Sequence, residues 1–168
     1  MTQTHTATRS LAAPPAACFD AWTDPAALAR WLPPDGMSGT VRSFDASEGG
    51  TFVIVLTHEA GPNDLAKSGD DTDVVEGRFV TLDRPGVVAF ESRFDSDKPE
   101  FAGTMRMTWR FDPAPDGGTL ASVVAEGVPP GIPQDIHEAG IAASLANLDR
   151  YLDAAPAPGG AGHRTEPE

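Results

Sequence analysis

The spacing of apolar and polar residues at the start of the chain predicts one strand followed by two short helices. The strand is expected at residues 4–11, and the Pro14-Pro15 pair after it suits the first turn of a helix, where proline is tolerated. Asp24-Pro25 starts a second helix, which the Pro33-Pro34 pair ends. The apolar residues expected to anchor these helices are Cys18, Phe19, Trp22, Leu28 and Trp31.

From Gly39 onwards the apolar residues alternate with a period of two, which is typical of strands with one buried face. Turn sequences such as Gly49-Gly50 separate the runs, and short connections between successive strands favour an antiparallel meander. The exception is the longer Gly/Asp-rich loop 59–71. The six strands are expected at Thr40–Phe44, Thr51–His58, Thr72–Leu82, Val87–Phe94, Thr104–Phe111 and Thr119–Glu126.

A long amphipathic helix is expected at residues 133–154, after the last strand. The tail 156–168 is rich in Ala, Pro and Gly and is expected to be disordered. The whole pattern predicts an α+β fold in a single domain over residues 1–155, with the long helix covering a curved antiparallel sheet. The helix carries one apolar stripe, formed by Ile141, Leu145, Leu148 and Leu152.

Composition narrows the class of protein. The chain has 168 residues, of which 40% are hydrophobic, which suits one domain with an ordinary core. A net charge of −13 disfavours nucleic acid and anionic membrane surfaces as partners. No segment approaches the roughly 20 apolar residues of a membrane-spanning helix. Cys18 is the only cysteine and no signal-peptide pattern is present, so a cytoplasmic location is expected.

Several short motifs, taken together, carry a resemblance to a known family. They are Phe19-Asp-Ala-Trp-Thr-Asp-Pro25, Trp31-Leu-Pro-Pro34, Gly36-Met37, Phe44-Asp45, Glu48-Gly-Gly50, Gly77-Arg-Phe79, Phe101-Ala-Gly103, Gly117-Gly-Thr119, Glu126-Gly-Val-Pro-Pro-Gly-Ile132 and Glu138-Ala-Gly140. Spread over residues 7–153, they resemble the START-like (SRPBCC) superfamily, and most of all bacterial proteins similar to the C-terminal domain of the heat-shock-protein-90 ATPase activator. The resemblance implies a helix-grip (START-like, Bet v 1-like) fold, in which a seven-stranded sheet wraps around the C-terminal helix.

The same resemblance bears on function. Relatives elsewhere in the superfamily bind lipids, steroids or polyketides between sheet and helix, or act as cyclases. This chain departs from its closer relatives at two positions: Ile141 follows Gly140 where a tryptophan is common, and Ala125 stands where a histidine is common. Both changes make the expected interior less polar. On the helix side of that interior we expect Gly140, Ile141 and Ser144.

Strand alternation separates the residues that face the helix from those that face solvent. The inner face is rich in aromatic residues and methionine, which suits either a solid core or a cavity on the order of 300–1,000 Å³ for an apolar or aromatic ligand. The residues expected to bind such a ligand are Phe52, Ile54, His58, Phe79, Phe90, Met105, Met107, Trp109, Gly140, Ile141 and Ser144. The opposite face carries Glu76, Arg78, Glu91 and Arg93, which predict a solvated ladder of charge pairs.

His58 is the one candidate for acid–base chemistry. It ends an apolar stripe beside the long loop, so its imidazole is expected either at a cavity mouth or, as an ordinary strand-end histidine, in solvent. His137-Glu138 resembles the start of a zinc-binding helix motif but Ile141 replaces the second histidine. Neither a metal nor another cofactor is expected, and Cys18 is expected to be a buried thiol.

Three functions follow from these observations. The favoured one is a cytoplasmic, non-enzymatic protein that binds a small apolar or aromatic molecule. The second is a polyketide cyclase or dehydratase-like enzyme in which His58 moves protons; the sequence indicates no second titratable group on the inner face. The third is an interaction module that acts on a chaperone, although the outer sheet face is charged. The sequence is also compatible with a homodimer.

Overall fold

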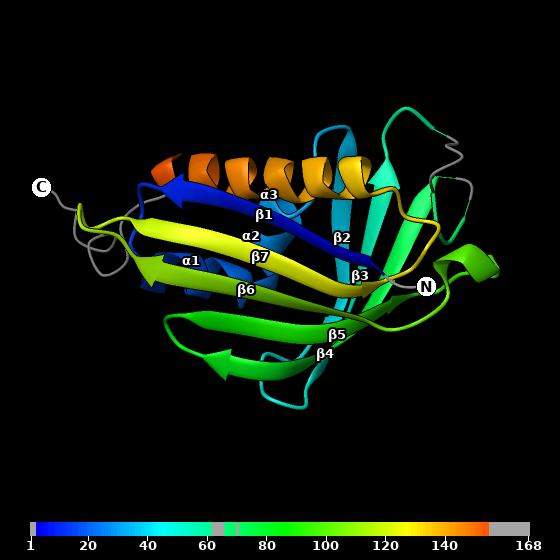
Figure 1. The fold of residues 1–168 in the computed structure, drawn as a ribbon, viewed down its shortest axis with the longest axis horizontal. Coiled ribbons are helices and arrows are strands. Elements are labelled where there is room, and N and C mark those ends of the chain that lie inside the picture. Colours follow the sequence, from blue (N-terminus) through cyan, green and yellow to red (C-terminus); the bar gives the residue numbers. More distant parts are fainter. Residues whose placement is uncertain (1–2, 62–65, 70, 155–168) are drawn as a thin grey trace, which may run out of the picture.

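A computed structural model of the chain describes residues 3–61, 66–69 and 71–154 (Figure 1). The predicted order of elements is confirmed, with a short 3-10 helix, η1, added before the sixth strand. The predicted tail 156–168 lies outside the described residues. The elements are β1 (Gln3–Leu11), α1 (Pro15–Trp22), α2 (Pro25–Trp31), β2 (Met37–Phe44), β3 (Thr51–His58), β4 (Thr72–Asp83), β5 (Val87–Phe94), η1 (Pro99–Phe101), β6 (Met105–Pro113), β7 (Thr119–Val128) and α3 (Gln134–Ala154).

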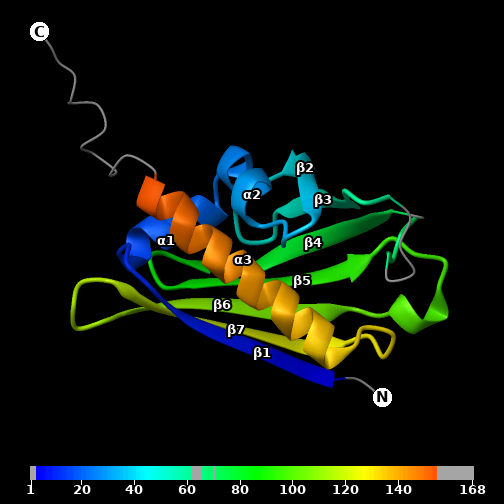
Figure 2. The same cartoon turned by 90° about the horizontal axis from the view of Figure 1, so that it is seen from above.

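The strands form one seven-stranded antiparallel sheet in the order β1-β7-β6-β5-β4-β3-β2. Helices α1 and α2 carry the chain from β1 at one edge to β2 at the other, and the remaining strands return as a meander. Figure 2 shows α3 crossing the inner face of the curved sheet, which confirms the α+β helix-grip arrangement. No helix in the described part of the chain is both long and apolar enough to cross a membrane.

One strand boundary differs notably from the expectation. β2 begins at Met37 rather than Thr40, because Met37 pairs with His58 at the far end of β3. Gly36, with a φ of 86°, allows the turn that aligns them. The earlier start matters for function because it places the first residues of β2 beside the start of the 59–71 loop.

The two short helices are fixed where the sequence predicted. The Asp24 side chain caps α2 by accepting hydrogen bonds from Ala26 N at 3.0 Å and Ala27 N at 3.5 Å. At the other end of α2, two backbone carbonyls accept hydrogen bonds from α3: Ser144 Oγ donates to Leu32 O at 2.5 Å, and Asn147 Nδ2 donates to Pro33 O at 2.9 Å. These bonds tie the middle of α3 to the segment that links α2 to β2.

The core is an aromatic cluster beneath α1 and α2. Trp22, which is 1% exposed, packs at its centre, with ring centroids 5.0 Å from Phe90 and 5.7 Å from Trp109. On the outer face, β4 and β5 place Glu76 opposite Arg93 and Arg78 opposite Glu91, as predicted, and Arg93 forms an ion pair with Glu76 at 2.9 Å. The interior is therefore densely packed at this end, and the outer face is polar.

Gly77 of β4 lies directly under the ring of Phe52, its partner on β3, and a Cβ at this position would overlap that ring. Replacing Gly77 with alanine is therefore expected to lower the free energy of unfolding by about 1–3 kcal/mol, because the ring must move. Gly86→Ala is the matched control, since its Cβ would meet only Phe111 O at 3.9 Å. Urea unfolding followed by tryptophan fluorescence measures both, and equal losses would contradict the packing described here.

Candidate functional site

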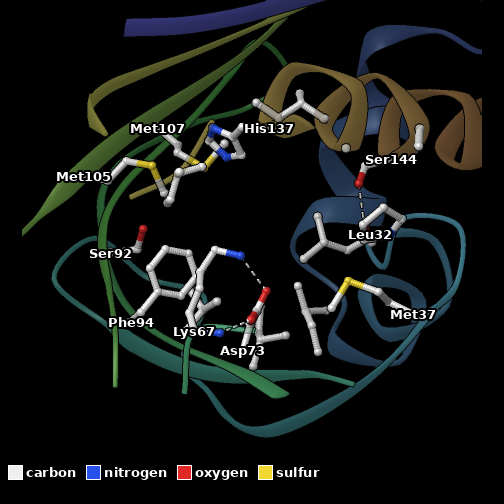
Figure 3. A pocket seen from close by; sticks show the side chains of 18 of the residues that line it. Leu32, Met37, Lys67, Asp73, Ser92, Phe94, Met105, Met107, His137 and Ser144 are labelled. Atoms are coloured by element: carbon white, nitrogen blue, oxygen red, sulfur yellow. Dashed lines mark hydrogen bonds and ion pairs between the residues drawn. The ribbon is translucent and has the colours of Figure 1, made fainter. Parts of the chain in front are cut away.

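A cavity of about 450 Å³ lies between the first half of α3 and the inner face of β3 to β6 (Figure 3). The aromatic cluster closes one side of it, because Trp22, Phe52, Phe90 and Trp109 belong to both. The most exposed residues of its lining lie in two places, at Asp35 in the loop after α2 and at Pro133, Ile136 and Ala139 near the start of α3. The opening therefore lies between these segments.

Most of the residues expected to face a ligand line this cavity, and whether they bind one stays a prediction. They are Phe52, Ile54, His58, Phe90, Met105, Met107, Trp109, Gly140, Ile141 and Ser144. Phe79 is the exception: it is fully buried, with its ring centroid 5.0 Å from that of Phe52 and 5.6 Å from that of Phe44. Although Phe79 pairs with Phe90, which lines the cavity, its own ring belongs to the solid part of the core.

A buried ion pair forms one polar element of the cavity wall. Lys67 Nζ lies 2.9 Å from Asp73 Oδ2, and the backbone N–H of Lys67 donates to Asp73 Oδ1 at 2.8 Å. The Lys67 ammonium also lies 5.0 Å from the centroid of the Phe94 ring. Figure 3 shows the pair at the side of the cavity opposite His137. No local sequence pattern predicts this pair, because Lys67 lies in the 59–71 loop and its partner is on β4.

Four buried side-chain atoms in the described part of the chain have no hydrogen-bond partner, and all four belong to residues that line the cavity. They are Trp22 Nε1, His58 Nε2, Ser92 Oγ and Trp109 Nε1. An unpaired buried polar group costs free energy, so such groups are uncommon in a core built only for stability. Their concentration around one cavity marks this region as the candidate site.

For His58, the sequence left two placements open, at a cavity mouth or in solvent. It ends β3, where its backbone N–H donates to Asp71 O at 2.7 Å, and its side chain is half-buried against the cavity. Its imidazole therefore lines the site rather than standing free in solvent. Because Nε2 has no hydrogen-bond partner, this nitrogen is available to form a hydrogen bond with a ligand after a small movement of the side chain.

A second imidazole, which sequence reasoning did not assign to the site, enters the cavity from α3. His137 Nδ1 lies 2.7 Å from Nδ1 of His5, a fully buried residue of β1. The ring centroids are 4.9 Å apart with an interplanar angle of 65°. The signal was present in the sequence, because His137 precedes Ile141 by four residues and so lies on the same apolar stripe of α3. Among the described residues, no group of three or more His, Cys, Asp or Glu side chains lies close enough together to hold a metal ion.

The environment keeps both imidazoles neutral at pH 7. The pKa of His137 is lowered to about 4, mainly by burial and to a smaller extent by the positive charge that His5 and Lys67 can carry, whereas the Glu138 carboxylate opposes the shift. Burial also lowers the pKa of His5, again opposed by Glu138. The Glu138 carboxylate accepts a hydrogen bond from Thr6 N at 2.8 Å, which lowers the pKa of Glu138. This bond holds the carboxylate on the backbone of β1, outside the His5–His137 hydrogen bond.

The lowered pKa of His137 predicts a loss of stability in mild acid. Above its ordinary pKa of 6.5 both states are neutral and the folded protein is fully stable; as the pH falls toward 4, the unfolded chain takes up a proton that the folded chain does not. Between pH 7.5 and pH 5, this effect lowers the free energy of unfolding by about 2 kcal/mol. Urea unfolding at both pH values should show a smaller loss in His137→Gln than in the wild type; an equal loss in both would contradict the burial of a neutral imidazole.

Cys18 has no part in the site. It is fully buried in α1, and burial raises the pKa of its thiol to about 11, so the thiol stays protonated at neutral pH. The expectation of a buried thiol is confirmed.

The chain is similar to one known protein family and to a number of solved structures. A sequence model of the family described as activator of Hsp90 ATPase homolog 1-like protein matches residues 12–153. A crystal structure of a protein from Chromobacterium violaceum is 30% identical, with a TM-score of 0.79, over 90% of this chain and 98% of that chain. A comparison with curated proteins gave no match.

More distant solved structures share the fold alone. A protein from Rhodobacter sphaeroides is 22% identical, with a TM-score of 0.72, over 90% of this chain and 92% of its own. DynU16, a protein of the dynemicin biosynthetic locus, is 18% identical with a TM-score of 0.62, over 90% of this chain and 47% of its own.

Proposed function

The chain belongs to the family of activator of Hsp90 ATPase homolog 1-like proteins, and we propose that this member binds a small apolar or aromatic molecule in the cavity between its sheet and α3. The observation that carries the proposal is the cavity itself. Its volume of about 450 Å³ lies within the range of small-molecule sites. We further propose that this site works in the cytoplasm and binds its ligand without a cofactor.

The lining supports a ligand that is largely apolar. Phenylalanine, tryptophan, methionine and isoleucine side chains form most of the wall, so a ligand gains free energy mainly by leaving water. A few polar groups interrupt this wall at separate points, among them Ser92, His58 and His137. Such isolated polar groups typically orient a ligand in an otherwise apolar site. We therefore favour a flat or aromatic frame with a small number of oxygen or nitrogen atoms.

An enzyme of the cyclase or dehydratase kind is the second candidate, because the cavity brings together two imidazoles. His58 and His137 both line it, and a proton acceptor and a proton donor are the minimum for such chemistry. A polyketide-like substrate that is turned over by the wild type and still bound, without turnover, by His58→Ala would favour this function. Equal turnover in both proteins would remove His58 from it.

A role as a chaperone interaction module has less support. It needs an exposed apolar surface, whereas among the described residues only Leu120 and Ile136 are large, apolar and well exposed, and they lie on different elements. Adding the purified chain to an Hsp90-type chaperone and measuring ATP hydrolysis tests this role directly. A reproducible rise in rate would revive it, and an unchanged rate would dismiss it.

Titration with N-phenyl-1-naphthylamine tests the proposed binding function. This neutral aromatic amine becomes strongly fluorescent on leaving water, and we expect it to bind at a single saturable site with a dissociation constant on the order of micromolar. An aliphatic alcohol of similar length should displace it less well than a fused aromatic ring does. Fluorescence that rises without saturation, as with nonspecific adsorption, would contradict the proposal.

A further inference from the structure

A chain of hydrogen bonds runs from the backbone of the 129–132 segment to the cavity, and its first link is Gln3. Gln3 Nε2 lies 3.0 Å from Ile132 O and 3.3 Å from Pro129 O. Both partners are carbonyl oxygens, which only accept, so the amide nitrogen must face them. The amide oxygen of Gln3 consequently points the other way, toward His5 two residues along the same strand.

The orientation of Gln3 settles which nitrogen of His5 carries the proton. Gln3 Oε1 lies 3.2 Å from His5 Nε2 and can only accept, so Nε2 carries the hydrogen. A neutral imidazole has one N–H, which leaves Nδ1 of His5 as an acceptor. That atom faces Nδ1 of His137 at 2.7 Å, and therefore His137 must donate from Nδ1.

The last step concerns the other nitrogen of His137. Both rings are neutral at pH 7, because burial lowers the pKa of each. With its only hydrogen on Nδ1, His137 keeps a free lone pair on Nε2. No described residue hydrogen-bonds this nitrogen, and Figure 3 shows the ring turned from α3 into the cavity near Met107.

We propose that His137 Nε2 is a fixed hydrogen-bond acceptor in the binding cavity, held by Gln3 and His5, and that the cavity selects ligands carrying a hydroxyl donor on an aromatic frame. This inference rests on the proposed binding function and specifies its ligand class. Phenols satisfy it, because each presents an O–H group at the edge of a flat apolar ring. His5 and Gln3 are positioning residues, since neither lines the cavity.

The tautomer can be measured without any ligand. A two-dimensional ¹⁵N–¹H spectrum of the histidine rings of the full chain at pH 7.5, assigned by comparison with His137→Gln, distinguishes a protonated Nδ1 from a protonated Nε2. We expect His137 to be protonated at Nδ1, which is the less populated neutral form of a free histidine side chain. A hydrogen on Nε2 would overturn the inference, whatever the protein binds.

Binding of 2-naphthol and of naphthalene gives the second test. The two compounds differ by one hydroxyl group. For each protein, the affinity for 2-naphthol divided by the affinity for naphthalene gives the preference for the hydroxyl group. Comparing this preference between two proteins cancels the different solubilities of the two compounds in water. We expect the preference for 2-naphthol to be about five- to tenfold greater in the wild type than in His137→Phe, as for one neutral hydrogen bond. Equal ratios in the two proteins would overturn the inference.

Gln3→Leu separates positioning from packing, because Gln3 does not line the cavity. We expect its 2-naphthol preference to fall toward that of His137→Phe, together with a partial shift of the His137 hydrogen to Nε2. A variant that keeps both the preference and the tautomer would show that Gln3 does not control them. If naphthalene binds every protein equally well and the hydroxyl makes no difference, this inference fails while the binding function stands; if no aromatic probe binds the wild type, both fail.

Discussion

Replacing Gly140 with tryptophan is expected to abolish most binding of N-phenyl-1-naphthylamine while leaving the protein folded. Gly140 lies in the part of α3 that lines the cavity, and a Cβ built on it meets no atom within 4 Å. A large side chain at this position therefore enters space that the proposed ligand needs. Overlap of this kind typically costs about 1–3 kcal/mol, which corresponds to an affinity weaker by about fivefold to 150-fold.

Gly140→Ala is the matched control for this experiment. Alanine removes the glycine penalty inside a helix, so the free energy of unfolding should rise by up to about 1 kcal/mol. A single methyl group occupies little of the cavity, and the affinity for the probe should stay close to that of the wild type. If the tryptophan variant bound the probe as tightly as the alanine variant, the probe would occupy a different place from the cavity described here.

The second large effect is expected at Trp22. Its ring contacts five other aromatic rings, with centroid distances from 5.0 to 6.2 Å, and it is 1% exposed. Truncation to alanine should lower the free energy of unfolding by about 3–5 kcal/mol, because it removes buried apolar surface and leaves a hole that rigid neighbours cannot fill. Domains of this size are usually stable by only about 5–15 kcal/mol, so the loss is a large fraction of the total.

Trp22→Phe keeps an aromatic ring in the cluster and should lose less, about 1–2 kcal/mol. Chemical denaturation followed by circular dichroism suits these variants, because removing a tryptophan alters the fluorescence signal. A loss below 1 kcal/mol in Trp22→Ala would mean that the cluster is loosely packed and does not organise α1 and α2 against the sheet.

The fold was predictable because its signals are local. Proline pairs mark the ends of the short helices, a period of two marks the strands, and the Ile141 stripe marks the face of α3. The family resemblance added the wrapping of a seven-stranded sheet around the C-terminal helix, and membership of the family is confirmed by the match over residues 12–153. The errors were at boundaries: β2 begins three residues early because Met37 pairs with His58, a contact set by tertiary structure.

The site was only partly predictable, because its polar groups meet through long-range contacts. Alternation along single strands was enough to place Met105, Met107 and Trp109 on the inner face. It could not show that Phe79 packs into the solid part of the core, since alternation gives the face of a residue but not its position along the sheet. The pairing of His5 with His137 joins residues 132 positions apart, and no local pattern links them.

The space between the sheet and α3 is proposed to hold a small molecule. Native mass spectrometry of the full chain, purified from its own host and compared with a denatured sample, tests this most directly. We predict a reproducible added mass that is present in the native spectrum, absent after denaturation and lost in Gly140→Trp, and that belongs to an aromatic molecule with a hydroxyl group. A native mass equal to that of the bare chain, which stays unchanged after incubation with 2-naphthol and N-phenyl-1-naphthylamine, would contradict it.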